Sequence, residues 1–182
     1  MKKLLLMAGL LATTSAAFAQ GTLVFANLAG GVNAPITNSA GGRIIGGAAG
    51  PNFVADLFFS TTLTSSSDQL TAAGFNQAFS TTTAGGGGYF LGGTKTLTGT
   101  TGAIEAQVRV WDLSKGATYA AALANNGEVG HSGLFTFSLT IPPSAPAPMV
   151  GLTGFHTVIP EPSTFALAGL GAAALVIFRR RK

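Results

Sequence analysis

Two histidines and five acidic residues are the candidates for chemistry in the central part of the chain, residues 20–159. His131 precedes Ser132 in a loop, and Asp112 is the nearest acid that could complete a Ser/His/Asp triad. A triad is defined by geometry, and the chain has no Gly-x-Ser-x-Gly elbow to support one. We therefore interpret His131 as a polar loop residue. His156 lies close to the C-terminal segment and is placed even less favourably for catalysis.

The acidic residues give little support for a hydrolase. Glycoside hydrolysis needs two carboxyl groups facing each other across a cleft, and the five acids are scattered over the central part: Asp56, Asp68, Glu105, Asp112 and Glu128. Glu105 shares a predicted strand face with Arg109, which favours a surface ion pair. A secreted hydrolase built on His131 or Glu105 therefore remains the weakest of three functional hypotheses.

The sequence also lacks the patterns that are typical of metal, thiol and phosphate-binding sites. The chain has no cysteine, which excludes disulfides, thiolate chemistry and a lipoprotein anchor. The acids do not form a calcium loop, and the glycine run 85–88 lacks the Gly-Lys-Thr ending of a phosphate loop. We expect no catalytic residue, no metal and no cofactor, and hence a protein that is not an enzyme.

Trp111 is the one side chain whose type suggests a ligand. In the predicted strand 103–113 it falls on the polar face with Glu105, Gln107 and Arg109. A half-exposed aromatic ring beside polar groups can stack on a sugar. Alternatively, Trp111 packs at the end of its strand beneath the Lys115 loop. A carbohydrate-binding module that uses Trp111 is therefore the alternative to a purely structural role, and it requires this ring to be exposed.

The elements that must position these residues are predicted to be strands. Residues 103–113 alternate strictly between apolar and polar, and 53–60 and 134–141 are two further strong candidates. In the third, Phe135, Phe137, Leu139 and Ile141 are expected to point one way. Weaker strands are expected at 22–26, 42–45, 89–91, 94–98, 118–123 and 154–158. Residues 68–74 suggest a short helix or a turn, and the proline-rich stretch 142–148 should be extended. The predicted fold class is an all-β, antiparallel β-sandwich.

The net charge of +4 does not describe the folded part of the chain. Six of the ten basic residues lie within four residues of a terminus. Residues 20–159 hold four basic and five acidic residues, and four minus five gives −1. The chain therefore lacks the basic patch that a nucleic-acid-binding domain needs, and no nucleic-acid partner is expected.

The N-terminus has the three parts of a secretory signal peptide. Lys2 and Lys3 are followed by the apolar run 4–12, and Ala17 and Ala19 form a small-x-small cleavage site. Cleavage there makes Gln20 the first residue of the mature protein. The expected partners at this stage are the Sec export machinery and signal peptidase.

The C-terminus predicts a short membrane anchor. Pro160, Glu161 and Pro162 come first, an uncharged and mostly apolar run covers 165–178, and the chain ends in four basic residues, Arg179, Arg180, Arg181 and Lys182. A helix of that run is about 21 Å long. With residues 163–164 included it just spans the hydrocarbon core. The basic cluster should stay cytoplasmic and stop transfer.

This tail, Val-Ile-Pro-Glu-Pro-Ser-Thr-Phe followed by an apolar run and an arginine cluster, closely resembles the PEP-CTERM sorting signal. The resemblance implies that an exosortase, an integral membrane enzyme, recognises Pro160, Glu161 and Pro162 and removes the helix. It also implies a Gram-negative, exopolysaccharide-producing bacterium, with the protein passing from an inner-membrane precursor to the cell surface or extracellular matrix. Exopolysaccharide is then a candidate partner. Strings of the central part, such as 107–112, are similar to ectodomains of that family, and no activity comes with them.

The expected organisation is therefore a signal peptide at 1–19 and a β-sandwich ectodomain at 20–141. A proline-rich stretch with a membrane-proximal strand follows at 142–159, and the sorting signal occupies 160–182, with a single transmembrane helix at 163–178 and a basic tail at 179–182. The function expected of such a chain is a non-catalytic structural or interaction role outside the inner membrane.

Overall fold

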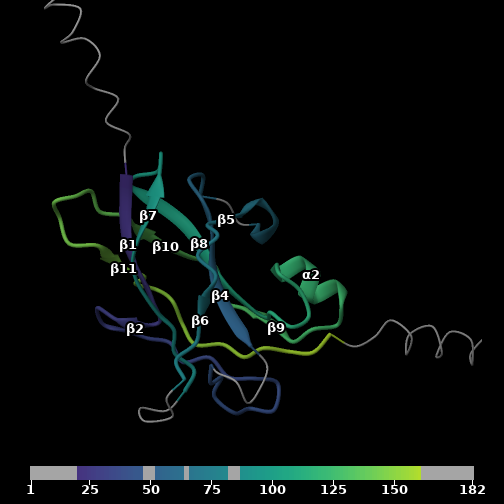
Figure 1. Ribbon diagram of the computed structural model, residues 1–182. Helices are drawn as coiled ribbons and strands as arrows, with labels where there is room; N and C mark the ends of the chain where they lie inside the picture. Colours follow the sequence, from purple (N-terminus) through teal and green to yellow (C-terminus); the bar gives the residue numbers. More distant parts are fainter. Residues whose placement is uncertain (1–19, 47–51, 64–65, 82–86, 161–182) are drawn as a thin grey trace, which may run out of the picture.

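The computed structural model describes residues 20–46, 52–63, 66–81 and 87–160 (Figure 1). The smaller of its two main sheets has β1 (Gln20–Ala26) in the centre. β7 (Leu91–Thr98) pairs with β1 in antiparallel orientation, and β11 (Ala147–Pro148) pairs with its other edge in parallel orientation. The prediction of antiparallel pairing is therefore wrong for the β1–β11 pair.

The larger sheet is built around β8 (Ala103–Asp112). β8 pairs along its whole length with β4 (Phe53–Ser60), from Phe53 opposite Asp112 to Ser60 opposite Glu105. Four short strands complete the sheet: β10 (Phe135–Ser138) and β9 (Val129–His131) pair with β8, and β5 (Thr71–Ala72) and β6 (Gln77–Ala78) pair with β4. A separate small hairpin joins β2 (Leu28–Ala29) to β3 (Val32–Asn33). The prediction of an all-β fold is confirmed.

One hydrophobic cluster receives side chains from both main sheets. β8 contributes Ile104, Ala106, Val108 and Val110, all with no exposed surface, as the alternation of its sequence predicts. The smaller sheet supplies Leu23, Phe25 and Leu97, and β4 supplies Phe53, Ala55 and Leu57. Because each strand turns alternate residues toward this shared interior, the two sheets form the two layers of the core.

The outer side of the larger sheet is covered by α2 (Tyr119–Ala124). The prediction of a strand at 118–123 is wrong. Thr118 lies in extended conformation, and its hydroxyl accepts a hydrogen bond from the N–H of Ala121 at 3.2 Å, which caps the helix. The Tyr-Ala-Ala-Ala-Leu-Ala sequence that follows is rich in strong helix formers. Ala122 then packs against Val54, Trp111 and Val129 in a second apolar cluster.

Several weaker predictions also need correction. The helix or turn expected at 68–74 is a single 3-10 turn, η1 (Ser67–Gln69), followed directly by β5, and its cap is Ser66. Residues 42–45 and 154–158 make isolated bridges and do not form strands. The two strands expected at 89–91 and 94–98 largely merge into β7. The strand at 134–141 is shorter than expected, and Ile141 is exposed because the chain turns there at Pro142 and Pro143.

The proline-rich stretch belongs to the same folded unit as the strands before it. A turn at its start places the N–H of Ser144 3.0 Å from the carbonyl of Ile141. The chain then returns to pair Ala147 with Leu23, and Met149 is buried without exposed surface. Residues 142–152 therefore complete the core and do not act as the extended stretch that their composition predicts.

Asn27 connects the small hairpin to the smaller sheet from a fully buried position. Its amide nitrogen donates to the carbonyls of Ala34 and Gly88 at 2.7 and 2.8 Å, and its amide oxygen accepts from the N–H of Phe90 at 2.8 Å. The buried side chain of Asn27 therefore satisfies three backbone groups that lie outside the strands.

The two described ends leave the domain on different sides in Figure 1, Gln20 at the start of β1 and Pro160 beyond β9. None of the helices in the described part of the chain has the length and apolar content needed to cross a bilayer. The predicted transmembrane helix at 163–178 and basic tail at 179–182 lie outside the described residues.

Candidate functional site

The last described segment, residues 154–160, is hydrogen-bonded to the domain on both of its sides. On one side, the N–H of Thr37 donates to the carbonyl of Phe155 at 3.1 Å, and the N–H of Thr157 donates to the carbonyl of Thr37 at 2.9 Å. On the other side, Val158 and Val129 exchange backbone hydrogen bonds of 2.7 and 2.9 Å. The last bridged residue, Val158, is thus only two positions before Pro160.

A carboxylate fixes the same segment from within. Thr157 has no exposed surface, and its hydroxyl donates to Glu128 Oε1 at 2.6 Å. The same oxygen accepts the backbone N–H of Ser39. Charge-assisted hydrogen bonds of this kind are stronger than neutral ones. We call the contacts among Ser39, Glu128 and Thr157 the C-terminal clamp, because they join three distant parts of the chain directly before the tail.

A groove of about 430 Å³ runs beside this segment. It is lined by side chains from α2, from β9 and from the C-terminal segment itself: Tyr119, Leu123, Val129, Gly130, His131, Phe155, His156, Val158 and Pro160. None of these residues is Lys, Arg, Asp or Glu. The groove is therefore mostly apolar, and its polar groups are two imidazoles and a phenol.

The structure brings both histidines of the chain to this groove, which the sequence analysis did not anticipate. His131 Nδ1 lies 3.1 Å from Gln107 Nε2, so a side-chain amide rather than a carboxylate orients the ring. The neighbouring Ser132 hydroxyl is already occupied, since it accepts the N–H of Val108 and donates to the carbonyl of Gly133. His131 and Ser132 therefore show no nucleophile–base arrangement.

The carboxylates considered for hydrolysis are placed elsewhere. Asp112 caps the turn after β8, where it accepts the N–H of Ser114 at 2.9 Å. Glu105 lies at the opposite end of β8, across from Thr136 and Ser60. The hydrolase hypothesis required His131 or Glu105 to converge with a second titratable group in a cleft. His131 shares the groove with His156 and Tyr119, whereas neither Asp112 nor Glu105 lines it.

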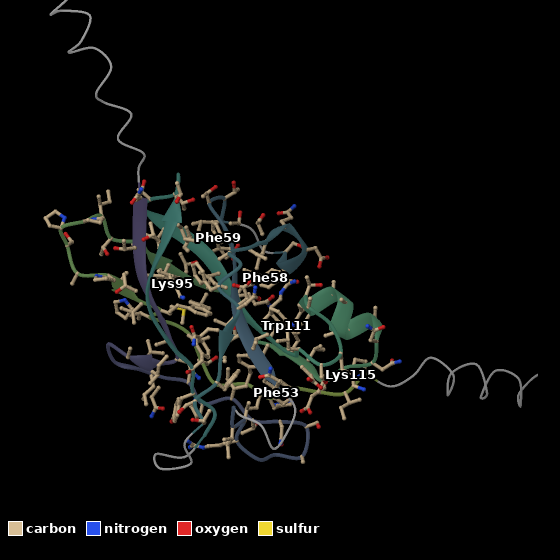
Figure 2. All side chains as sticks on the ribbon, in the orientation of Figure 1. Phe53, Phe58, Phe59, Lys95, Trp111 and Lys115 are labelled. Carbon is tan, nitrogen blue, oxygen red and sulfur yellow. The ribbon has the colours of Figure 1, made fainter. Side chains whose placement is uncertain are left out.

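Trp111 is not available for sugar stacking, which corrects the carbohydrate-binding hypothesis in the form that used this ring. It is only 2% exposed, because Tyr119 and Ala122 of α2 close over it, and its indole N–H donates to the carbonyl of Gly116 at 3.1 Å. Figure 2 shows Trp111 on the side of the sheet that faces α2. The alternative that it packs beneath the loop of Lys115 and Gly116 is the one observed.

Arg109 occupies the polar face of β8 next to this cluster. Its guanidinium lies 4.1 Å from the ring centroid of Phe58 and 5.3 Å from that of Tyr119, and it donates to Gln107 and to the carbonyl of Ser67. Burial lowers the pKa of Arg109 and raises the pKa of Tyr119. Arg109 therefore braces α2 and η1 against the sheet through contacts that differ from the ion pair with Glu105 expected from the sequence.

Asp56 is buried on β4 and has a structural role. Its carboxylate accepts backbone N–H groups of Leu57, Gly74 and Phe75 at 2.7–3.0 Å, and burial raises its pKa above the ordinary value. It ties the loop before β6 to the sheet. Among the described residues no cluster of three or more His, Asp or Glu side chains has the arrangement of a metal site.

Only two of the predicted processing residues are described. Gln20 begins β1 and pairs with Thr98, so the predicted mature N-terminus coincides with the first residue of a strand. Pro160 is half-buried on the rim of the groove. The remaining ones, Ala17, Ala19, Glu161, Pro162, Arg179, Arg180, Arg181 and Lys182, lie outside the described residues.

Comparison with known proteins identifies the segment that follows the clamp. Residues 158–182 match the family model of the PEP-CTERM protein-sorting motif, which confirms the resemblance seen in the sequence. No curated protein and no solved structure is significantly similar to the chain. The matched segment begins at Val158, the last residue that is bridged to the domain.

Proposed function

We propose, from the PEP-CTERM sorting motif that this chain carries, that it is an envelope or matrix protein delivered to the outside of a Gram-negative cell. The motif indicates an exported protein that is processed at the membrane. In this proposal the Sec machinery and signal peptidase produce a chain starting at Gln20. An exosortase then recognises Pro160, Glu161 and Pro162, and the tail with its stop-transfer arginines is removed.

The single observation that carries the proposal is the position of the motif. It starts at Val158, and the described segment that leads to it is hydrogen-bonded into the domain up to Thr157. Removal of the chain after this point therefore leaves the core and the clamp intact. A domain of this kind can be separated from its membrane precursor without losing its fold.

The role of the ectodomain in this proposal is structural or adhesive and non-catalytic. The groove holds two imidazoles without a carboxylate to orient them, and the Ser132 hydroxyl is engaged by the backbone. Exopolysaccharide is a candidate partner, and it would contact surfaces other than Trp111.

The proposal is tested by expressing the chain in a host with an exosortase and in the same host without it. We expect the protein to leave the inner membrane only when the enzyme is present. The variant Glu161→Ala should retain it in the membrane in both hosts. Glu105→Ala is a matched control, because it changes a glutamate on β8 outside both the motif and the clamp, and it should still be processed. Release in the absence of exosortase, or equal release of the Glu161→Ala variant, would contradict the proposal.

A further inference from the structure

We infer that the face of the domain formed by Tyr119, Leu123 and Val158 rests on the lipid surface while the tail is attached. We call these three residues the basal face. The inference rests on the proposed function, because it assumes that the tail anchors the precursor in a bilayer. It assigns to the groove beside the clamp a partner, the outer surface of the membrane.

Large apolar side chains are exposed on the basal face. Leu123 is 45% and Val158 50% exposed, although each has the size to fill a core. Leu123 comes from α2 and Val158 from the C-terminal segment, and both line the same groove. Large apolar side chains that gather on one face mark an interaction site, whereas isolated ones do not.

The connection between the folded domain and the apolar run of the tail is short. The apolar run begins at Phe165, five residues after Pro160. Even fully extended, five residues span at most about 18 Å. The headgroup layer of one leaflet takes up about 5–8 Å of that distance. The rim of the groove at Pro160 therefore lies close to the lipid surface whenever residues 165–178 are in the bilayer.

The domain also has little freedom to rotate away from the membrane while the tail is attached. The C-terminal clamp and the Val129–Val158 bridge hold the chain up to two residues before Pro160. Pro160 and Pro162 further restrict the backbone of the connection. A short connection that starts from a fixed point limits which face meets the membrane, and that face contains Leu123 and Val158.

The chemistry of the face fits lipid better than a charged partner. The residues that line the groove include no Lys, Arg, Asp or Glu. Tyr119 supplies an aromatic ring with a polar hydroxyl, the kind of side chain that is enriched at the membrane–water boundary. Contact through apolar and aromatic groups should persist in high salt, which screens the attraction between exposed charges.

The absence of cysteine from the sequence provides a clean test, because one introduced cysteine is the only attachment point for a fluorophore. We would label Leu123→Cys in the full-length chain, reconstituted in phosphatidylcholine vesicles that carry a nitroxide on the headgroup. Ile141→Cys is the matched control. Ile141 is 56% exposed, and in Figure 1 its loop, between β10 and β11, lies at the opposite end of the domain from α2. Leu123 belongs to α2 and not to the C-terminal segment, so its label reports where the domain itself lies relative to the lipid.

The expected result is a blue-shifted emission of the Leu123 label and its quenching by the nitroxide, unchanged in high salt, with the Ile141 label unquenched. Native emission from Trp111 would confirm that both labelled proteins are folded. If the chain floats with the vesicles but both labels stay unquenched, the inference is overturned and the proposed function stands. If the chain does not float with the vesicles, both fail.

Two further outcomes would also overturn the inference in favour of another partner. A blue shift of the Leu123 label that grows with protein concentration, without quenching by the nitroxide, would indicate a second copy of the chain on the basal face. A shift that appears only when an exosortase shares the vesicle would indicate a protein surface.

Discussion

The hydroxyl of Thr157 donates a 2.6 Å hydrogen bond to Glu128, and this contact ties the end of the folded domain to the residue directly before β9. Thr157 has no exposed surface, whereas Glu128 is partly exposed, so the contact is half-buried. It lies one residue before the segment that matches the sorting motif. The matched segment therefore begins inside the folded domain, at a residue that is still bridged to Val129.

Removing the Thr157 hydroxyl should destabilise the domain. In Thr157→Val, Glu128 keeps only the N–H of Ser39, and we expect the free energy of unfolding to fall by about 1–3 kcal/mol, the usual effect of losing a hydrogen bond to a charged group. Urea titration followed by the fluorescence of Trp111, the only tryptophan, measures this value. Thr157→Ser should recover most of the loss, and Thr153→Val, at an exposed threonine, should change little. Equal effects at positions 153 and 157 would contradict the clamp.

The buried amide of Asn27 supports a second, isosteric prediction. In Asn27→Asp, the amide nitrogen that donates to Ala34 and Gly88 becomes an oxygen facing two carbonyls, and an unpaired charge is buried. We expect a loss of about 3 kcal/mol or more, or failure to fold.

Asn38 provides the matched control for this substitution. Its side-chain oxygen accepts the N–H groups of Ala40 and Gly42, a role that aspartate keeps. Asn38→Asp should stay within about 0.5 kcal/mol of the unmodified protein in the same titration. Similar losses of stability at Asn27 and Asn38 would contradict the role that we assign to the buried hydrogen bonds of Asn27.

Much of the main sheet could be predicted from the sequence, because its strands are long and their alternation is strict. β8 and β4 begin within a residue of where the pattern places them, since four alternating apolar residues of β8 all enter the core. α2 was missed because six residues are too few to show helical periodicity, so Thr118 and the alanines resembled a weak strand. The sequence did contain one signal of this helix, because threonine, here Thr118, is a preferred N-cap residue.

The groove could not be predicted, because its lining comes from three separate segments that only tertiary packing brings together. His131 and His156 are far apart in sequence, and no spacing rule connects β9 to the C-terminal segment. The strand predicted at 154–158 did not form, because the partners of this segment are single bridges to Thr37 and Val129. The sequence left open whether Trp111 is exposed or packed, because it falls on the polar face of β8 and only the contact with α2 buries it.

Trp111 should behave as a core residue. Trp111→Ala is expected to reduce the free energy of unfolding by about 3–5 kcal/mol, as in other truncations of large buried side chains. Exposed Leu113, two residues later, should tolerate alanine with a change within about 0.5 kcal/mol. The native Trp111 emission should also resist acrylamide quenching and be unchanged by neutral oligosaccharides. Strong quenching, or a response to sugar, would restore the stacking role.

Stability should depend on pH through Asp56. Burial raises its pKa in the folded state, so over the range between the unfolded and folded pKa values the native state binds more protons than the unfolded state. The contribution of Asp56 to stability is therefore greatest at low pH and is lost as the pH rises through the folded pKa. Measured by urea titration across acidic and neutral pH, the stability of the unmodified protein minus that of Asp56→Asn should fall with rising pH. A difference that increases with pH would contradict this direction.

The most direct test of the account is the intact mass of the protein recovered outside cells that contain an exosortase. The account predicts a chain that starts at Gln20 and ends after Val158, so that the clamp between Thr157 and Glu128 survives processing. A chain that ends before Thr157, or one that keeps the arginine cluster at residues 179–181, would contradict it.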